Sequence, residues 1–226
     1  MNHQATTLSV FTFPPEERFW AFSQMAFARR YLLNVPGLQF RKLMGAGQGL
    51  GFTRDPDWSR YAFLGVWESE RDARQFHLSS TFAKQYQQRA RRFSTLYLQT
   101  IQAHGKWSGK NPFPPTSGAK SGDGTIGVLT RASIRPTRLK KFWEMVEPVS
   151  RELEGAEGLC ASIGIGELPL IRQATFSIWE SAEQMKAFAY NNGTHRQVVV
   201  RTRQENWYSE DLFARFLITD SVGEFP

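Results

Sequence analysis

Histidines are scarce in this chain, and one of them has an unusual setting. The sequence has only four histidines. His195 follows Asn191-Asn192-Gly193 and precedes the apolar run 198–200, so we expect a helix to restart there with the imidazole directed beneath a sheet. One imidazole is too few ligands for a zinc or non-heme iron site, which needs three or four. It is sufficient for heme, because the porphyrin supplies the equatorial donors.

The remaining histidines and the one cysteine keep alternatives open. His77 falls in the corresponding helix of the first half of the chain and is the competing candidate ligand. His3 lies near the N-terminus, and His104 lies just before a Gly- and Pro-rich segment. An ordinary surface or hydrogen-bonded histidine is the alternative for His195 as well. Cys160, in the apolar stretch LCASIGIG, is expected to be a buried thiol rather than a nucleophile or ligand.

Two further patterns favour structure over chemistry. The glycines of GAGQGLGF (45–52) do not fit GxGxxG, which would need glycine at Leu50, and no Lys-Ser/Thr pair follows as in a P-loop. We therefore predict a flexible loop between two strands. Glu68 and Glu180 occupy equivalent positions of an internal repeat, which favours a shared role at a strand–helix junction over an acid–base pair.

The elements that must position these residues occur twice. Residues 60–76 (RYAFLGVWESERDARQF) align without a gap with residues 172–188 (RQATFSIWESAEQMKAF), at an offset of 112. Upstream, the same comparison matches Val10-Phe11-Thr12 with Val128-Leu129-Thr130, Phe19-Trp20 with Phe142-Trp143, and Gly37-Leu38 with Gly158-Leu159. The larger upstream offsets predict a longer loop in the first copy, near residues 47–59. A pattern of this length indicates duplication of a small domain rather than a solenoid.

Each copy predicts the order βαββαβ, the split βαβ of a ferredoxin-like unit. In the first copy, the expected strands are 8–13, 38–47, 61–69 and 94–102, and the first helix is 14–33. In the second copy, the expected strands are 125–133, 159–167, 173–181 and 211–220, and the first helix is 135–153. The second helix is expected to run unbroken over 70–93 in the first copy and to break into 183–190 and 194–206 in the second. The serine after each Trp-Glu is expected to cap the N-terminus of the second helix in its copy.

The predicted fold class is therefore α+β, with two tandem ferredoxin-like repeats packed face to face as a single-chain dimeric α+β barrel. Helices cover only one face of each sheet, so the other copy must cover the second face. The predicted boundaries are residues 1–104 for the N-terminal repeat, 105–124 for a Gly-, Pro- and Ser-rich linker, and 125–226 for the C-terminal repeat, which carries the candidate ligand.

Composition limits the location and the partners. The chain has 226 residues, a net charge of +7 and no run of about 18 apolar residues. The N-terminal residues do not resemble a secretory signal, so we expect a cytoplasmic protein. A basic surface suits nucleic acid, an anionic membrane or an acidic protein, and a solvated surface is the ordinary alternative. No helix-turn-helix, zinc-finger or RNP pattern is present, so no nucleic-acid partner is expected.

Three stretches of the chain are similar to the spheroidene monooxygenase family of bacterial carotenoid oxygenases. They are KLMGAGQGLGFTRDPDW (42–58), GKWSGKNPF (105–113) and AFAYNNGTHRQVVVRTRQENWYSEDLFARF (187–216), and the resemblance runs over nearly the whole chain. It implies a heme b protein that inserts oxygen from O₂ into a carotenoid polyene to give a hydroxyl and then a ketone. It also implies kinship with aldoxime dehydratases and other heme proteins on this barrel, which hold heme through one histidine of the C-terminal copy.

The same resemblance assigns roles to individual residues. His195 is expected to bind the heme iron, and Arg196, Arg201 and Arg203 to pair with the heme propionates, with ordinary surface arginine as the alternative. Phe188 and Trp207 are expected to line the pocket, with ordinary core residues as the alternative. No catalytic residue on the substrate side of the heme is identified.

The implied partners are an apolar carotenoid and an external ferredoxin-like electron donor, because the chain has no flavin or nicotinamide motif. A lipid-soluble substrate also implies peripheral contact with the inner face of the cell membrane. Two other functions stay open at this point. They are a different heme enzyme, aldoxime dehydratase-like or peroxide-using, and a heme-free binding module on the same barrel.

Overall fold

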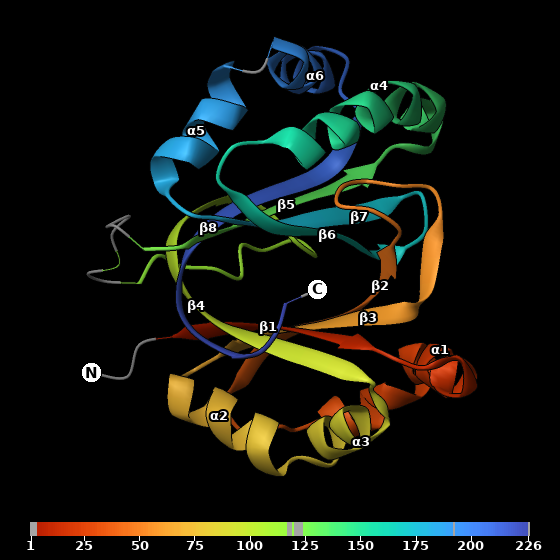
Figure 1. Ribbon diagram of the computed structural model, residues 1–226, viewed down its shortest axis with the longest axis vertical. Helices are drawn as coiled ribbons and strands as arrows, with labels where there is room; N and C mark the ends of the chain where they lie inside the picture. The colour runs from red at the N-terminus through yellow and green to blue at the C-terminus, as the bar shows by residue number, and fades with distance from the viewer. Residues whose placement is uncertain (1–3, 117–118, 120–123, 192, 226) are drawn as a thin grey trace.

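Within the described residues, eight antiparallel strands close into one barrel, and helices cover two opposite outer sides (Figure 1). The computed structural model describes residues 4–116, 119, 124–191 and 193–225, and the side chains of residues 147, 148, 151, 190, 191, 193–197 and 199 lie outside this description. The order around the barrel is β1-β3-β2-β6-β7-β5-β8-β4. Each half therefore contributes four adjacent strands.

Both halves follow the order βαββαβ. The first half consists of β1 (Ala5–Thr12), η1 (Pro15–Glu17), α1 (Arg18–Phe27), η2 (Ala28–Leu32), β2 (Leu38–Gly47), β3 (Pro56–Trp67), α2 (Glu70–Ser79), α3 (Thr81–Arg89) and β4 (Arg92–Gly105). The second half consists of β5 (Ile126–Ile134), η3 (Pro136–Arg138), α4 (Leu139–Glu152), η4 (Leu153–Gly155), β6 (Leu159–Leu168), β7 (Arg172–Trp179), α5 (Ala182–Asn191), α6 (Gly193–Gln204) and β8 (Tyr208–Gly223). The predicted barrel of two ferredoxin-like repeats is confirmed, while the residue boundaries of the repeats and linker stay a prediction.

The duplication is visible in matched turns before β2 and β6. Gly37 and Gly158 both have positive φ angles, 72° and 76°. Their carbonyl oxygens accept hydrogen bonds from the backbone N–H groups of Glu68 and Glu180, at 2.8 and 2.9 Å. Glycine is required at both turns, because an added Cβ would lie within 3 Å of a side chain of the following helix. Glu68 and Glu180 thus share a strand–helix junction, as predicted.

The predicted serine caps are also present in both halves. The hydroxyl of Ser69 accepts a hydrogen bond from the backbone N–H of Asp72 at 3.2 Å, and the hydroxyl of Ser181 accepts one from Gln184 at 3.2 Å. Each bond satisfies one of the unpaired N–H groups at a helix start.

Pairing within the barrel corrects the upstream alignment. Trp67 pairs with Ala5, and its counterpart Trp179 pairs with Ile126, so β1 and β5 are related by an offset of 121. The same offset relates the starts of α1 and α4. The predicted equivalences of Phe11 with Leu129 and of Phe19 with Phe142 are therefore wrong. The matched residues had similar side chains but lie at different positions of the fold.

The break in the second helix is also shared by both halves. The predicted continuous helix over 70–93 is wrong, because α2 ends at Ser79 and α3 begins at Thr81. Ser80 adopts an extended backbone and caps α3 by accepting a hydrogen bond from Ala83 N–H at 3.0 Å. The second half also has two helices here, with α5 ending at Asn191 and α6 beginning at Gly193. The break before His195 is thus a property of the scaffold rather than of one copy.

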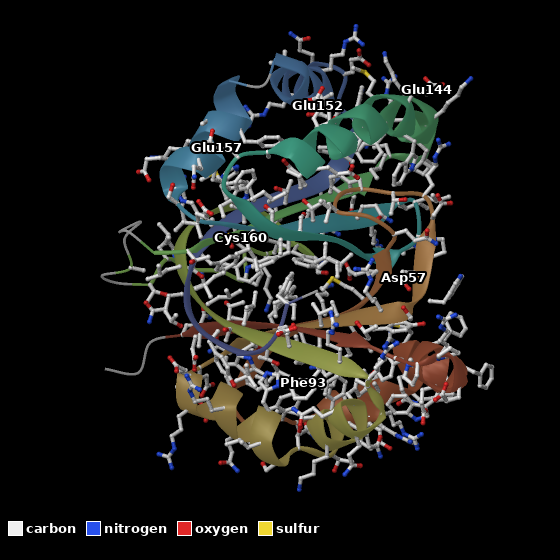
Figure 2. All side chains as sticks on the ribbon, in the orientation of Figure 1. Asp57, Phe93, Glu144, Glu152, Glu157 and Cys160 are labelled. Carbon is white, nitrogen blue, oxygen red and sulfur yellow. The ribbon has the colours of Figure 1, made fainter. Side chains whose placement is uncertain are left out.

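Apolar side chains fill the barrel and the layers outside it (Figure 2). The interior combines residues of both halves, such as Leu8, Met44, Ile163 and Phe216. Outside, one large aromatic cluster lies under the helices of the first half, whereas two separate clusters lie under those of the second. Cys160 is exposed, at a bulge in β6, so the prediction of a buried thiol is wrong.

The matched turns give a test of the fold. We expect Gly158→Ala to lower the free energy of unfolding by about 1–3 kcal/mol, because alanine is strained at positive φ and its Cβ meets Gln184. Gly155→Ala is the control, because no atom lies within 4 Å of its added Cβ. Urea denaturation measures both variants, and equal stability would contradict the assigned role of the turn.

Candidate functional site

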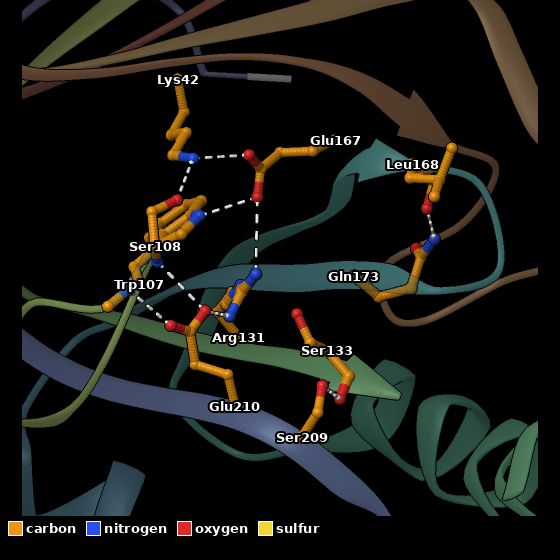
Figure 3. Close-up of polar contacts among 11 residues, drawn as sticks. Lys42, Trp107, Ser108, Arg131, Ser133, Glu167, Leu168, Gln173, Ser209 and Glu210 are labelled. Atoms are coloured by element: carbon orange, nitrogen blue, oxygen red, sulfur yellow. Dashed lines mark hydrogen bonds and ion pairs between the residues drawn. The ribbon is translucent and has the colours of Figure 1, made fainter. Parts of the chain in front are cut away.

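A network of charges around the buried Arg131, with three partly buried partners, lies at one end of the barrel (Figure 3). Arg131 of β5 is 3% exposed and pairs with Glu210 of β8 and with Glu167 of β6, the latter at 3.6 Å. Lys42 of β2 binds the other oxygen of Glu167 at 2.6 Å. The two positive and two negative groups balance one another, so the network is neutral as a whole. Such mutual pairing is the condition for keeping charges out of water.

The network also holds the segment that follows β4. The indole N–H of Trp107 donates to Glu167 at 2.7 Å, and the hydroxyl of Ser108 accepts from Lys42 at 2.8 Å. The carboxylate of Glu210 accepts from the backbone N–H groups of Ser108 and Gly109, at 3.1 and 2.7 Å. The segment is thereby fixed across the end of the barrel.

Trp107 and Phe113 are fully buried in the barrel interior. The ring of Trp107 lies against Phe40, and the ring of Phe113 against Phe216. This part of the predicted linker therefore packs inside the barrel as part of its core. Since every carboxylate of the network has its partners, the arrangement is suited to structure more than to reaction.

Hydrogen bonding changes the titration of Glu210. Burial alone would raise the pKa of this carboxyl group, but the N–H groups of Gly109 and Ser108 and the charge of Arg131 outweigh it and hold the pKa below its usual value. A carboxylate with a lowered pKa stabilises the fold above its unfolded pKa, and this contribution is lost as the pH falls through the folded value.

The glycine-rich connection between β2 and β3 lies against the second half. The hydroxyl of Ser162 in β6 donates to the carbonyl of Leu50, and the hydroxyl of Ser150 in α4 donates to the carbonyl of Phe52 at 3.1 Å. The carbonyl of Gly51 would contact any Cβ added at Gly164. The connection therefore joins two strands as predicted, and it also forms a wall on the outer side of the second sheet.

The predicted site residues Phe188 and Trp207 lie in different clusters. Phe188 of α5 packs on Trp179, with ring centroids 5.3 Å apart. Its counterpart Phe76 packs on Trp67 at 4.9 Å, so this contact belongs to the repeated scaffold. Trp207, in the turn that follows α6, is fully buried, and its indole N–H donates to Glu205 at 3.0 Å.

The predicted basic residues lie on α6. Arg201 and Arg203 are exposed, and the guanidinium of Arg201 lies 3.2 Å from the sulfur of Met145. His195 and Arg196 fall within the span of α6, but their side chains lie outside the described part of the structure. Their proposed roles remain predictions. Elsewhere, no three histidine, cysteine, aspartate or glutamate side chains among the described residues converge to hold a metal ion.

His77, the competing candidate, is enclosed by the first half. It is buried among the rings of Trp67, Phe76 and Tyr97, and its Nε2 lies 3.3 Å from the Thr7 hydroxyl. Burial lowers its pKa from 6.5 to about 4. These contacts favour a packed, neutral structural histidine. His104 is exposed, with its ring stacked on Phe213 at 5.2 Å.

Sequence reasoning missed the buried charge network. Its members are Lys42, Arg131, Glu167 and Glu210, which lie on four strands and far apart in the chain. The signal available was indirect. Lys42, Trp107 and Glu210 lie in the three stretches that carried the family resemblance.

The barrel itself defines the class: one chain in which two ferredoxin-like repeats form a single α+β barrel. Two aldoxime dehydratase structures share this fold. One, aldoxime dehydratase OxdRE in complex with butyraldoxime, has a TM-score of 0.62 and 10% identity, covering 96% of this chain and 80% of that chain. The other has a TM-score of 0.63 and 9% identity, covering 99% of this chain and 86% of that chain.

Sequence comparison identifies the family. The spheroidene monooxygenase of Rhodobacter capsulatus is 37% identical over 221 residues, which are 97% of this chain and 92% of that protein. Those of Cereibacter sphaeroides and Rubrivivax gelatinosus are 36% and 33% identical, covering 98% and 90% of this chain and 69% and 77% of those proteins. No family model matches the chain. The chain belongs to the spheroidene monooxygenase family, which confirms the resemblance seen in its motifs.

The charge network predicts a large effect of a small substitution. We expect Glu210→Gln to lower the free energy of unfolding by about 3 kcal/mol at neutral pH, because it leaves Arg131 with too little negative charge. The difference from the wild type should shrink in acid, where Glu210 itself becomes protonated. Glu144→Gln is the control. Glu144 pairs with Lys140 at 4.0 Å and both side chains are mostly exposed, so this substitution should change the free energy of unfolding by less than about 0.5 kcal/mol. Equal losses in both variants would contradict a buried network.

His77 predicts a separate dependence of stability on pH. Between pH 6.5 and about 4 the unfolded chain binds a proton that the folded chain excludes. The contribution of His77 is therefore complete above 6.5 and should fall by up to about 3 kcal/mol as the pH drops through this window. Denaturation at a series of pH values should show a shallower slope for His77→Gln and an unchanged slope for His104→Gln. An unchanged slope in His77→Gln would mean that this imidazole is not buried in solution.

Proposed function

We propose that this protein is a heme-dependent monooxygenase that oxidises a carotenoid. The carotenoid and the monooxygenase activity follow from the 33–37% identity to proteins named spheroidene monooxygenase over most of the chain. The heme is a further step, and it is supported by the difference between the two halves of the barrel.

In the first half, aromatic rings fill the layer between the sheet and α3. Phe82 of α3 lies 4.9 Å from Phe63 of β3 and 4.1 Å from Tyr86, and Tyr86 lies 5.0 Å from Phe11 of β1. All four are buried. This packing leaves no room for a flat ligand between sheet and helix.

The equivalent positions of the second half carry smaller side chains. The register of the strands and the starts of the helices relate the two sets of positions. The aromatic residues and their counterparts are Phe11 and Ala132, Tyr61 and Gln173, Phe63 and Thr175, Phe82 and Thr194, and Tyr86 and Val198. Five rings of the first half are thus absent from this layer, while Phe142, Trp143 and Trp207 pack around Val198. The volume of the five missing rings is what supports a planar group beneath α6.

At one position of this layer, a small side chain of the first half corresponds to a larger one in the second. Ala83 of α3 is 1% exposed and faces the first sheet, and its counterpart in α6 is position 195. Position 195 also lies three residues before the buried Val198, on the same side of a helix. A histidine in the sequence at the position equivalent to the buried Ala83 is the observation that carries the heme proposal.

The chain's own residues suit this assignment. Heme bound in the layer would supply O₂ activation at an iron reduced by an external electron donor. The residues around it would exclude water, with Thr175 and Ala132 as a floor on the sheet and the β2–β3 connection as one wall. Arg196, Arg201 and Arg203 remain the candidates for the propionates, and an iron–sulfur protein remains the candidate electron donor.

Heme titration of the purified protein tests the cofactor. We expect a Soret band in the wild type, its loss or shift in His195→Ala, and partial recovery with added imidazole, while His77→Ala resembles the wild type after circular dichroism confirms folding. Thr175→Phe, which restores the ring found at Phe63, should weaken heme uptake at least about tenfold by overfilling the layer, and Thr175→Val should not. A normal band in both His195→Ala and Thr175→Phe would remove heme from this layer.

The reaction is tested separately. We expect cells that make spheroidene and express the protein to accumulate a product that has gained oxygen, with the atom derived from labelled O₂ as measured by mass spectrometry. A protein that binds heme and converts an aldoxime but not a carotenoid would instead be a heme enzyme of another kind. A protein with no Soret band after heme addition would be a heme-free module.

A further inference from the structure

Aromatic side chains on and beside α1 are exposed to solvent. Phe19, Phe22 and Phe27 of α1 are 84%, 53% and 60% exposed, and Trp58 of β3 is 54% exposed. The rings of Phe22 and Trp58 are 5.6 Å apart and meet edge to face. We call these four residues the aromatic rim. Several large aromatic side chains gathered on a surface are typical of a binding site.

The scaffold does not require these aromatic residues. By the offset that relates α1 to α4, the counterpart of Phe19 is Lys140, which is almost fully exposed. The counterpart of Phe22 is Trp143, which is buried in the second half. The same helix position therefore accepts a charged side chain in one copy, and the exposed Phe19 needs an explanation other than folding.

Basic residues surround the rim. Arg18 and Arg29 are exposed beside its phenylalanines, and Arg91 and Arg92 are exposed at the end of β1, where Arg91 N–H donates to the carbonyl of Thr12. Among the described residues, these four arginines form no ion pair with a carboxylate. The rim thus joins apolar rings with free positive charge, a combination that suits the boundary of an anionic lipid bilayer.

The acidic neighbours of the rim are partly neutralised. Glu17 pairs with Arg89 at 2.9 Å, and Asp57 pairs with Arg60 at 2.6 Å. Glu16 and Asp55 are exposed and act against binding to an anionic surface. Four unpaired arginines against these two carboxylates leave the surface basic.

The rim lies on the same side of the molecule as the connection that covers the second half. Figure 1 shows α1, the β2–β3 connection and the N-terminal end of α4 along one side, and Figure 2 labels Asp57, the neighbour of Trp58, and Glu144 there. An open groove of about 340 Å³ lies between the β2–β3 connection, the N-terminal end of α4 and the turn between β6 and β7. Its lining residues are Arg54, Leu139, Lys140, Trp143, Glu144 and Leu170.

We propose that the aromatic rim docks on an anionic lipid bilayer, with its rings in the boundary between headgroups and acyl chains and its arginines against lipid phosphates. No helix in the described part of the chain is long and apolar enough to cross a bilayer. A second copy of the chain is a poorer occupant, because each copy carries a net charge of +7 and would present arginines to arginines. The inference does not depend on the proposed oxidation, because lipid binding needs neither carotenoid nor turnover.

Vesicle flotation of the purified full chain tests the proposal. We expect the wild type to float with vesicles of phosphatidylcholine and phosphatidylglycerol, and to bind less with phosphatidylcholine alone or at high salt. The double variant Phe19→Ser/Phe22→Ser should lose binding by at least about tenfold, because two rings no longer leave water. The double variant Arg91→Gln/Arg92→Gln should lose about tenfold on anionic vesicles and depend less on salt.

Leu78→Ser is the matched control. Leu78 is 76% exposed on α2, outside the rim, so its removal should leave binding within about twofold of the wild type. The proposal is overturned if the wild type does not float, or if the phenylalanine variant floats as the wild type does. It is equally overturned if the phenylalanine variant changes only the mass measured by light scattering, because the rim would then join two copies of the chain.

Discussion

The buried guanidinium of Arg131 is the constraint on which the closed end of the barrel depends. A charge that is 3% exposed needs carboxylates close by. Glu210 supplies one from the neighbouring strand β8, and Glu167 supplies the other from β6, two strands away. The carboxylates in turn require donors, which come from Lys42 of the first half and from the segment of Trp107, Ser108 and Gly109. One buried charge thus ties together both halves and the chain that joins them.

The same network also strengthens the junction between β2 of the first half and β6 of the second. The strands β2 and β6 share only two residue pairs, whereas β4 and β8 pair along most of their length. The short junction is reinforced by Lys42 and Glu167 at 2.6 Å and by the β2–β3 connection, which lies on β6. Closure of the barrel on this side therefore rests on side chains as much as on the backbone ladder.

The order of helices and strands could be predicted from the sequence, because the alternation of apolar and polar residues, the prolines and the turn glycines each set the backbone locally. The matched glycines at 37 and 158 and the serine caps at 69 and 181 are examples in which one residue sets the local backbone. Family membership was accessible for a different reason, since long stretches of residues match those of known proteins.

The errors came from properties that depend on tertiary context. Matching Phe19 with Phe142 compared like side chains, but helix starts and strand pairing assign Phe19 to Lys140. The break at Ser80 was missed because a single serine between two polar helices gives a weak signal. The charge network was missed because its partners meet only after the barrel closes, and no spacing in the sequence relates Lys42 to Glu167.

The two halves differ most in the layer between the sheet and its second pair of helices. In the first half, the ring stack of Phe63, Phe82 and Tyr86 fills the layer under α3 and stabilises it by apolar burial. The second half keeps the same order of elements but has Thr175, Thr194 and Val198 at these positions. Its cluster is built instead on Phe142, Trp143 and Trp207, which come from other positions of the repeat. The β2–β3 connection lies between these two regions of the molecule. It places Leu50 and Phe52 against β6 and α4, and it leads into β3, whose first residues include the rim residue Trp58. The eight residues between β2 and β3 therefore pack against the second half, while the strand that follows them carries a residue of the rim, so one short connection lies between the two regions.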